Sequence, residues 1–396
     1  MKFMDWLDER LAVRQIVKLM LTEYYVPKNI NFLWSFGVLI MVVFAILVVS
    51  GIFLLMYYKP DSHLAFDSVN KTIMMDVEYG WLFRHTHAVA ASIMFLVLYV
   101  HMARGIYYGS FKAPREIVWI TGYILFILMA ATAFTGYLLP WGQMSYWAAQ
   151  TITTLFEKIP FIGPDLVVWI RGNYIVEDAT LTRFFALHVV FLPLLLIVFT
   201  GIHLYAVRIV GSNNEDGIEL TKEEKKHGKG IPFWPVFMAK EFFVISVFLI
   251  FFFYLVFYQY KFAMDPINFT PADYLQTPTH IYPEWYFLAF YEVLRGFFFS
   301  QNLGLIAFVL SMFIAAFLPW LDTSPIKSGN HRPLYKILFF IFVADFVFLT
   351  ILGKLPPTGL YAWLGFAGSL VYFAFFFALP IISRIEKKKL EGGRQI

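Results

Sequence analysis

The 396-residue chain contains no cysteine. This absence excludes disulfides, thiolate metal sites, iron–sulfur clusters and a thioether-attached haem on the chain itself. Charge is also scarce, since charged residues make up 15% of the chain and hydrophobic residues 60%. A soluble domain cannot bury that much apolar surface, and no basic run with interleaved aromatic residues indicates nucleic acid binding. The composition therefore predicts an integral membrane protein.

Eight apolar runs of about 20 residues are long enough to cross a hydrocarbon layer of about 30 Å as helices. They lie near residues 32–57, 83–106, 117–139, 184–207, 242–260, 303–321, 337–353 and 361–383. We therefore expect an all-α membrane protein with an N-terminal bundle of four transmembrane helices and a C-terminal half of four more. The expected segments are an interfacial N-terminus, the N-terminal bundle, a polar connecting loop and the C-terminal half, at 1–29, 30–210, 211–241 and 242–396.

Basic residues are distributed unequally between the two sides of the predicted membrane protein. The loops on the side of the two termini hold 22 lysines and arginines, and the loops on the other side hold 7. Loops rich in Lys and Arg face the cytoplasm. We therefore expect both termini to lie on the cytoplasmic side of a bacterial inner membrane.

The first twenty residues mix charged side chains with Phe3, Trp6, Leu7 and Leu11. They lack a small-residue cleavage site before the first long apolar run, so a signal peptide is not predicted. The pattern favours an amphipathic helix that lies in the membrane interface. A solvated arm is the alternative.

Histidines occupy matched positions in the second and fourth spans. His87 and His101 are 14 residues apart, which places them within about 40° of one helix face and about 21 Å apart along the axis. His188 and His203 repeat the arrangement at a spacing of 15. Because one span intervenes, the two helices run in the same direction, so His87 meets His188 and His101 meets His203. His85 would point roughly 160° away from His101 on the same geometry and is a poorer ligand.

An ionisable side chain inside a membrane span is costly and usually functional, although a single histidine could bridge two helices by a hydrogen bond. Two matched pairs on parallel helices favour metal binding. Two facing imidazoles saturate a haem iron and leave no position for oxygen, which suits the site to electron transfer. The histidines therefore predict two non-covalent, bis-histidine b-type haems stacked across the bilayer.

Glycines and arginines accompany the histidines. Four glycines repeat the 14-residue spacing, Gly37 and Gly51 in the first span and Gly122 and Gly136 in the third. Their missing side chains would let a flat macrocycle approach, with ordinary helix packing as the alternative. Arg84 and Arg104, at the two membrane edges, are candidates to pair with haem propionates, unless they are snorkelling anchors.

The 15-residue spacing conflicts with the 14-residue spacing of the partner helix. One extra residue rotates His203 by about 100° and shifts it by about 1.5 Å on a regular helix. We expect a kink or π-bulge between His188 and His203, around Pro193, to absorb that residue.

Several motifs resemble cytochrome b of the respiratory and photosynthetic cytochrome bc complexes, over nearly the whole chain. Besides the spaced histidines, they are "ARGIYYGS" after His101, "GYLLPWGQMSYW" at 136–147, "RFFALH", "GSNN" at 211–214 and "PEWYFL" at 283–288. The resemblance implies a quinol–cytochrome c oxidoreductase that runs a Q cycle. It also implies partners: a Rieske iron–sulfur protein, a membrane-anchored c-type cytochrome, the quinone pool and a second copy of the complex.

The same resemblance assigns roles to individual residues. His87 and His188 would hold an outer, low-potential haem, and His101 and His203 an inner, high-potential one. At the outer quinol site Glu284 is the candidate proton acceptor, with Tyr137 and Tyr291 as polar pocket members and Ala148 beside them. Without the resemblance, Glu284 could be an interfacial residue in an aromatic belt. At the inner quinone site the matching residues are Ser212, Lys240 and Glu241.

Some positions depart from the mitochondrial pattern. Arg208 and the spacing of 15 are similar to the chloroplast type, in which the two halves are separate chains. Ser35 stands where that type carries a haem-attaching cysteine. Ala148 replaces a mitochondrial glycine, and Glu241 stands where one-chain members often carry aspartate. The combination indicates a bacterial one-chain form with a chloroplast-type fourth helix.

Two other functions remain open at this point. A dihaem membrane anchor of a dehydrogenase or hydrogenase also pairs histidines across a bundle, but needs neither "PEWY" nor eight spans. A transporter could use intramembrane histidines to relay protons, but would not need matched spacings on parallel helices.

Overall fold

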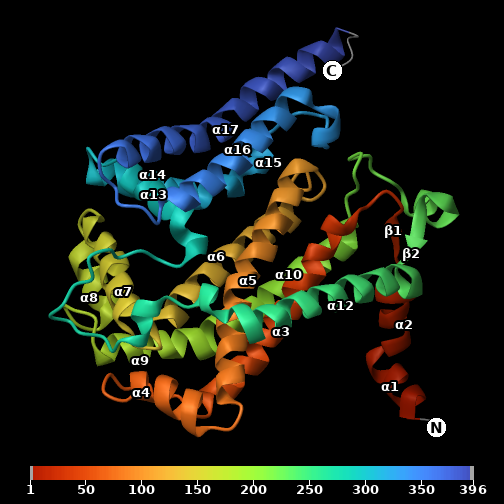
Figure 1. Ribbon diagram of the computed structural model, residues 1–396. Coiled ribbons are helices and arrows are strands. Elements are labelled where there is room, and N and C mark those ends of the chain that lie inside the picture. Colours follow the sequence, from red (N-terminus) through yellow and green to blue (C-terminus); the bar gives the residue numbers. More distant parts are fainter. Residues whose placement is uncertain (1–2, 393–396) are drawn as a thin grey trace.

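The computed structural model describes residues 3–392 and is built almost entirely from helices (Figure 1). Within this range, eight helical stretches are long and apolar enough to cross a membrane, as the sequence predicts. They are Phe32–Leu55, Gly80–Tyr107, Glu116–Leu138, Asp178–Val210, Phe233–Ala263, Gln301–Leu321, Pro333–Leu352 and Leu360–Glu391.

Four of these stretches form the N-terminal bundle. Their main helices are α3 (Phe36–Leu55), α5 (Gly80–Tyr107), α6 (Glu116–Leu138) and, in the fourth stretch, α9 (Asp178–Ala186) followed by α10 (Leu192–Val210). α3 packs along α5, and α6 packs along α10. Because successive spans alternate in direction, α5 and α10 are parallel, which is the arrangement that the histidine pairs require.

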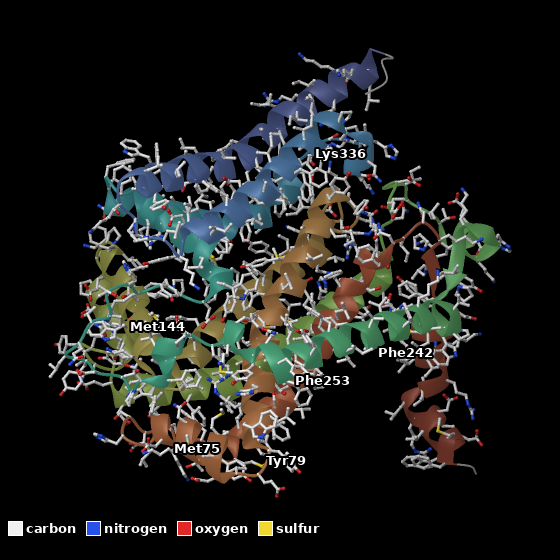
Figure 2. All side chains as sticks on the ribbon, viewed as in Figure 1. Met75, Tyr79, Met144, Phe242, Phe253 and Lys336 are labelled. Atoms are coloured by element: carbon white, nitrogen blue, oxygen red, sulfur yellow. The ribbon has the colours of Figure 1, made fainter. Side chains whose placement is uncertain are left out.

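The helices of the C-terminal half are α12 (Met238–Tyr254), α13 (Leu288–Gly296), α14 (Gln301–Phe313), α15 (Leu318–Leu321), α16 (Pro333–Leu352) and α17 (Leu360–Glu391). In Figure 1, α13 to α17 lie together above α5 and α6, whereas α12 lies against α3 and α5 of the N-terminal bundle. A buried aromatic cluster that includes Phe95, Phe126, Phe290 and Phe376 joins the two halves. Aromatic side chains such as Phe242 and Phe253 project along α12 (Figure 2), and their exposure is that of a lipid-facing surface.

Local sequence explains where the long helices begin and end. Pro333 opens α16 at a first-turn position, where its missing N–H costs nothing. The Ser300 hydroxyl accepts a hydrogen bond from the Leu303 backbone N–H at the start of α14. α10 ends at Val210, and Gly211 directly after it has a φ of 79°, in the left-handed region that favours glycine.

Short elements complete the chain on both sides of the bundle. α4 (Ala65–Asp67), α7 (Gln143–Leu155) and α8 (Gly163–Arg171) lie in the loops on one side, and α11 (Lys222–Glu224) lies in the polar loop on the other. The strands β1 (Tyr25–Pro27) and β2 (Gly230–Pro232) pair in antiparallel fashion, with Val26 opposite Ile231. This pairing ties the N-terminal segment to the loop between the two halves.

The N-terminal segment forms α1 (Phe3–Leu11) and α2 (Val13–Val17), which extend away from the body in Figure 1. Phe3, Trp6 and Leu11 are exposed, while Arg14 Nη2 pairs with Asp5 at 2.6 Å. α1 therefore has the amphipathic character that the sequence predicts. Its contact with the membrane interface stays a prediction.

The fourth span contains the predicted irregularity. Residues Leu187–Phe191, including His188, form a π-helix, and regular α-helix resumes at Leu192, immediately before Pro193. A π-turn holds one more residue than an α-turn, so it absorbs the fifteenth residue of the spacing. The expectation of a local distortion between His188 and His203 is confirmed.

Candidate functional site

His87 and His188 face each other between two parallel segments of the bundle. His87 lies on α5 and His188 in the π-helix, and their ring centroids are 6.2 Å apart with planes inclined at 75°. Two metal–nitrogen bonds of about 2 Å, each with roughly 1 Å more to the ring centre, span about 6 Å. The observed separation therefore fits one metal ion held between the two imidazoles.

A partner fixes the Nδ1 atom in three of the four histidine rings. His87 Nδ1 lies 2.9 Å from Ser50 Oγ, His203 Nδ1 lies 3.1 Å from Thr121 Oγ1, and His188 Nδ1 lies 2.8 Å from the Thr132 carbonyl oxygen. A carbonyl can only accept, so His188 donates from Nδ1, which leaves its Nε2 with a lone pair. Such outer hydrogen bonds orient metal-binding imidazoles and set their tautomer.

Each of the four predicted glycines lies against one of the four histidines. A Cβ atom built at Gly37 would lie 3.4 Å from the His101 ring, at Gly51 3.2 Å from His87 and at Gly122 3.0 Å from His203; at Gly136 it would collide with His188. From the sequence we expected these glycines to accommodate a macrocycle. In the structure their missing side chains make room for the imidazole rings. Each glycine therefore allows one histidine ring to pack closely against the backbone of the neighbouring helix.

The two arginines lie at opposite ends of α5. Arg84 lines the same cavity as His87 and His188. Arg104 Nη2 lies 3.5 Å from His101 Nδ1, and its Nη1 donates to Ser110 Oγ at 3.3 Å. Within the part of the chain that the structure describes, the buried Nε of Arg104 has no hydrogen-bond partner. A buried guanidinium with an unpaired N–H is suited to an anionic ligand group such as a carboxylate.

These features fit a haem better than a bare metal ion. Among residues 3–392, no group of three or more His, Cys, Asp or Glu side chains is placed to hold an ion. A porphyrin supplies four ligands itself and needs two axial imidazoles from the protein. His85, the poorer candidate, stacks on Tyr260 at 3.7 Å and is not among the residues that line the cavity of His87 and His188.

The cavity between His87 and His188 extends to the "PEWY" segment. Its volume is about 320 Å³, and its lining includes Glu284, Tyr137 and Asp265 besides the histidines. Glu284 is half-buried. Burial, followed by the negative charge of Asp265, raises the pKa of Glu284 to about 7, while the Tyr137 hydroxyl within hydrogen-bonding reach opposes the shift. A carboxyl group that titrates near neutral pH can exchange protons in either direction.

A smaller hollow adjoins this cavity. Its lining consists of Phe134, Tyr137, Ala148, Ile152, Pro283, Glu284, Tyr286 and Phe287. The structure thus brings Ala148, Tyr137 and Glu284 together around one hollow. Tyr291 does not line this hollow; its hydroxyl donates to the Ile281 carbonyl oxygen at 3.0 Å.

The segment after α12 holds the outer loops in place, and sequence reasoning missed its role. Asn268 Oδ1 accepts from the Ser145 backbone N–H at 2.8 Å, and the Asp273 carbonyl oxygen accepts from Trp147 Nε1 at 3.1 Å. Tyr282 donates to Asp265 Oδ2 at 2.8 Å. The available signal was "MDPINFTPAD" at 264–273, in which acidic residues and prolines interrupt an apolar region.

On the opposite side of the membrane the predicted inner residues are only partly brought together. The Arg208 guanidinium lies over the Tyr24 ring at 4.1 Å and the Phe233 ring at 4.2 Å, and the Tyr24 hydroxyl lies 3.5 Å from Ser212 Oγ. Tyr24 was not singled out from the sequence.

Glu241 and Lys240 point in different directions at this inner side. Glu241 is buried and accepts a hydrogen bond from Ser35 Oγ at 2.8 Å. Ser35 therefore occupies its position as the partner of a buried carboxyl group. Lys240, the next residue along the chain, is exposed.

Comparison with known proteins finds relatives of one family along nearly the whole chain. Two family models match, "Cytochrome b/b6/petB" over residues 21–211 and "Cytochrome b(C-terminal)/b6/petD" over residues 271–373. Cytochrome b of Rickettsia typhi is 44% identical over 384 residues, which are 97% of this chain and 94% of that protein. Cytochrome b of Allochromatium vinosum is 43% identical over 98% of this chain and 96% of its own length.

The chain belongs to the cytochrome b family. A solved chain from a hyperthermophilic respiratory Complex III superposes with a TM-score of 0.92 at 43% identity, covering 98% of this chain and all of that one. This cytochrome b is therefore a haem-binding, multi-pass electron-transfer subunit of a bacterial bc complex. The alternatives of a dehydrogenase anchor and a transporter are set aside by that membership.

Proposed function

We propose that this cytochrome b oxidises quinol at an outer site and reduces quinone at an inner site, in a Q cycle that contributes to the proton gradient. One observation carries the proposal. A single cavity extends from the facing imidazoles of His87 and His188 to the carboxyl group of Glu284. The electron acceptor, a haem held by His87 and His188, and the proton acceptor, Glu284, would thus border the same cavity.

Two b haems, ligated by His87 with His188 and by His101 with His203, would supply one-electron transfer from the outer to the inner side. The chain itself orients the imidazoles of His87, His188 and His203 through their Nδ1 partners, and a glycine lies behind each of the four rings. Arg84 and Arg104 would neutralise the propionates at the two membrane edges.

At the outer site Glu284 would take up a proton as quinol is oxidised. Its pKa of about 7 lies near the operating pH, where a general base combines a high fraction of the basic form with sufficient proton affinity. Tyr137 would orient the carboxylate, and Ala148 would shape the hollow beside it. Of the two electrons of each quinol, one would go to a Rieske iron–sulfur protein and then to a c-type cytochrome, and the other to the outer haem.

At the inner site we assign quinone binding to Ser212 and Arg208, with Glu241 as a proton donor. Arg208 lies over the rings of Tyr24 and Phe233, and the Tyr24 hydroxyl lies 3.5 Å from Ser212 Oγ. Ser35 donates a hydrogen bond to Glu241. Lys240 would contribute positive charge at the rim. We further propose that the complex is a homodimer in a bacterial inner membrane with both termini of this chain in the cytoplasm.

Replacement of Glu284 by glutamine tests the outer-site proposal. Glutamine keeps the shape but cannot accept the proton, so quinol–cytochrome c turnover of the purified complex should fall about 100-fold, with both haem spectra intact. Glu223→Gln, at an exposed loop position, is the control and should turn over normally. Wild-type turnover of Glu284→Gln at every pH would show that another group takes the proton.

A further inference from the structure

A buried ion pair lies directly behind the "PEWY" loop. Glu292 on α13 is 1% exposed, and its Oε2 accepts from Arg295 Nε at 3.0 Å and from Nη2 of the same arginine. On α17, a Cβ atom at Gly365 would collide with Glu292 Oε1. Glycine at that position therefore leaves the room that the carboxylate needs.

Arg295 connects this ion pair to two neighbouring elements. Its Nη1 donates to the Leu355 carbonyl oxygen at 3.1 Å and its Nη2 to the Leu352 carbonyl oxygen at 3.0 Å, at the end of α16. Its guanidinium also lies over the Tyr291 ring, 4.7 Å from the centroid. A planar guanidinium can stack on an aromatic face and donate at its edge in this way, so Arg295 fixes the plane of the Tyr291 ring.

Tyr291 in turn holds the loop that carries Glu284. Its hydroxyl donates to the Ile281 carbonyl oxygen at 3.0 Å, three residues before Glu284. The hydrogen bond closes a ten-residue loop, and Tyr291 itself does not line the hollow at Glu284. Contacts therefore run without a gap from Glu292 through Arg295 and Tyr291 to the backbone before Glu284.

We infer that Glu292 is a positioning residue for quinol oxidation, acting through Arg295 and Tyr291 to hold the Glu284 loop. The inference rests on the proposed role of Glu284. Burial of a charge is costly unless it is paired, so loss of the Glu292 charge releases Arg295 from its place between α13, α16 and Tyr291. These helices lie together in Figure 1. A shift of about 1 Å at a catalytic group can cost up to about 100-fold in rate.

A double-mutant cycle tests this route. Glu292→Gln should lower kcat/KM for a soluble short-chain quinol at least about tenfold, whereas Glu292→Asp, which keeps the charge, should recover most of the loss. If Glu292 acts through Tyr291, the Glu292→Gln substitution should cost nothing further in a Tyr291→Phe background, because residues of one unit are not additive.

Glu386→Gln is the matched control. Glu386 is 3% exposed and also pairs with an arginine, Arg332 Nε at 3.0 Å, but it lies toward the other end of the helices, near Lys112 and Asp322. It should leave kcat/KM unchanged. Three results would overturn the inference. Glu386→Gln could lower kcat/KM as much as Glu292→Gln does, or Glu292→Gln could leave kcat/KM unchanged. Glu292→Gln could also lower kcat/KM by its full factor in the Tyr291→Phe background.

Two further readouts keep the outcomes distinct. If the Glu292→Gln complex does not assemble with normal haem spectra, Arg295→Lys replaces it, because lysine keeps the charge but cannot stack on the Tyr291 ring. The effect of Arg295→Lys on kcat/KM should likewise be non-additive with that of Tyr291→Phe. Additive effects would refute the route. Failure of the proposed function would be seen separately, as normal turnover in Glu284→Gln.

Discussion

At the scale of single residues, the charge of one neighbour adjusts the proton acceptor. Asp265 raises the pKa of Glu284, second in effect to burial. Glu284 must be ionised to accept a proton, so turnover should rise with pH through about 7. Because the pKa of Glu284 is raised above its ordinary value, the folded protein favours the neutral carboxyl group. The contribution of this neutral group to the free energy of unfolding is therefore lost as pH rises through about 7.

Asp265→Asn should therefore shift the acid limb of the turnover profile to lower pH. The substitution removes the negative charge but keeps an oxygen that can accept from Tyr282. The measurement is the pH dependence of kcat/KM in the purified complex. A midpoint that stays at the wild-type pH, or moves upward, would show that the Asp265 charge does not act on the titrating group.

Some residues of the candidate site could be predicted from the sequence, and others could not. The facing directions of the histidines could be predicted because helical spacing converts directly into direction in space. The same spacing singled out the four glycines, but it did not show that they lie against the imidazole rings. The Nδ1 partners Ser50, Thr121 and Thr132 could not be predicted, because each lies on a neighbouring helix whose rotation no spacing specifies. Asp265 was missed for the same reason, since its effect depends on the fold of a loop.

At the scale of elements, the π-helix Leu187–Phe191 reconciles two different spacings. Apolar run length predicted all eight spans, and the conflict between 14 and 15 residues predicted this irregularity. The short helices α7, α8 and α13 were not predicted from the sequence. Contacts between distant segments, such as Ser145 with Asn268, hold them, and local pattern does not encode those contacts.

Deletion of single residues tests the role of the π-helix. Deletion of Val190, inside the π-helix, should convert it to regular α-helix, restore a spacing of 14 and leave both haems bound. Deletion of Ile197, equally exposed at 54% against 56% but in regular helix, should rotate His203 relative to the intact bulge by about 100° and release a haem. Haem content of the two purified variants decides, and equal content would contradict the account.

At the scale of the whole molecule, a buried group of four charges joins the two halves. Lys112, before α6, pairs with Asp322 at 3.0 Å, Asp322 pairs with Arg332 at 2.6 Å, and Arg332 pairs with Glu386. All four are buried. Burial opposes ionisation of Asp322, but Lys112 and Arg332 hold its pKa below the usual value. Its stabilising effect is thus present at neutral pH and is lost as pH falls through that depressed pKa.

Asp322→Asn should lower the free energy of unfolding by about 3–5 kcal/mol, because it leaves the buried Lys112 without its ion-pair partner and removes one of the two carboxylates that pair with the buried Arg332. Thermal unfolding of the detergent-solubilised complex measures the change. Asp67→Asn is the control. The side chains of Asp67 and its partner Lys71 are 51% and 64% exposed, and an exposed ion pair contributes only about 0–1 kcal/mol. Equal shifts in the two variants would show that burial of the four charges is not what joins the halves.

The number of haems bound by each histidine pair tests the central claim most directly. Wild-type protein should contain two extractable b haems per chain and none that remains attached in denaturing electrophoresis, because the chain has no cysteine. His188→Leu should retain one, the haem of His101 and His203, with a simplified reduced-minus-oxidised spectrum. One haem in the wild type, or two in His188→Leu, would contradict the account.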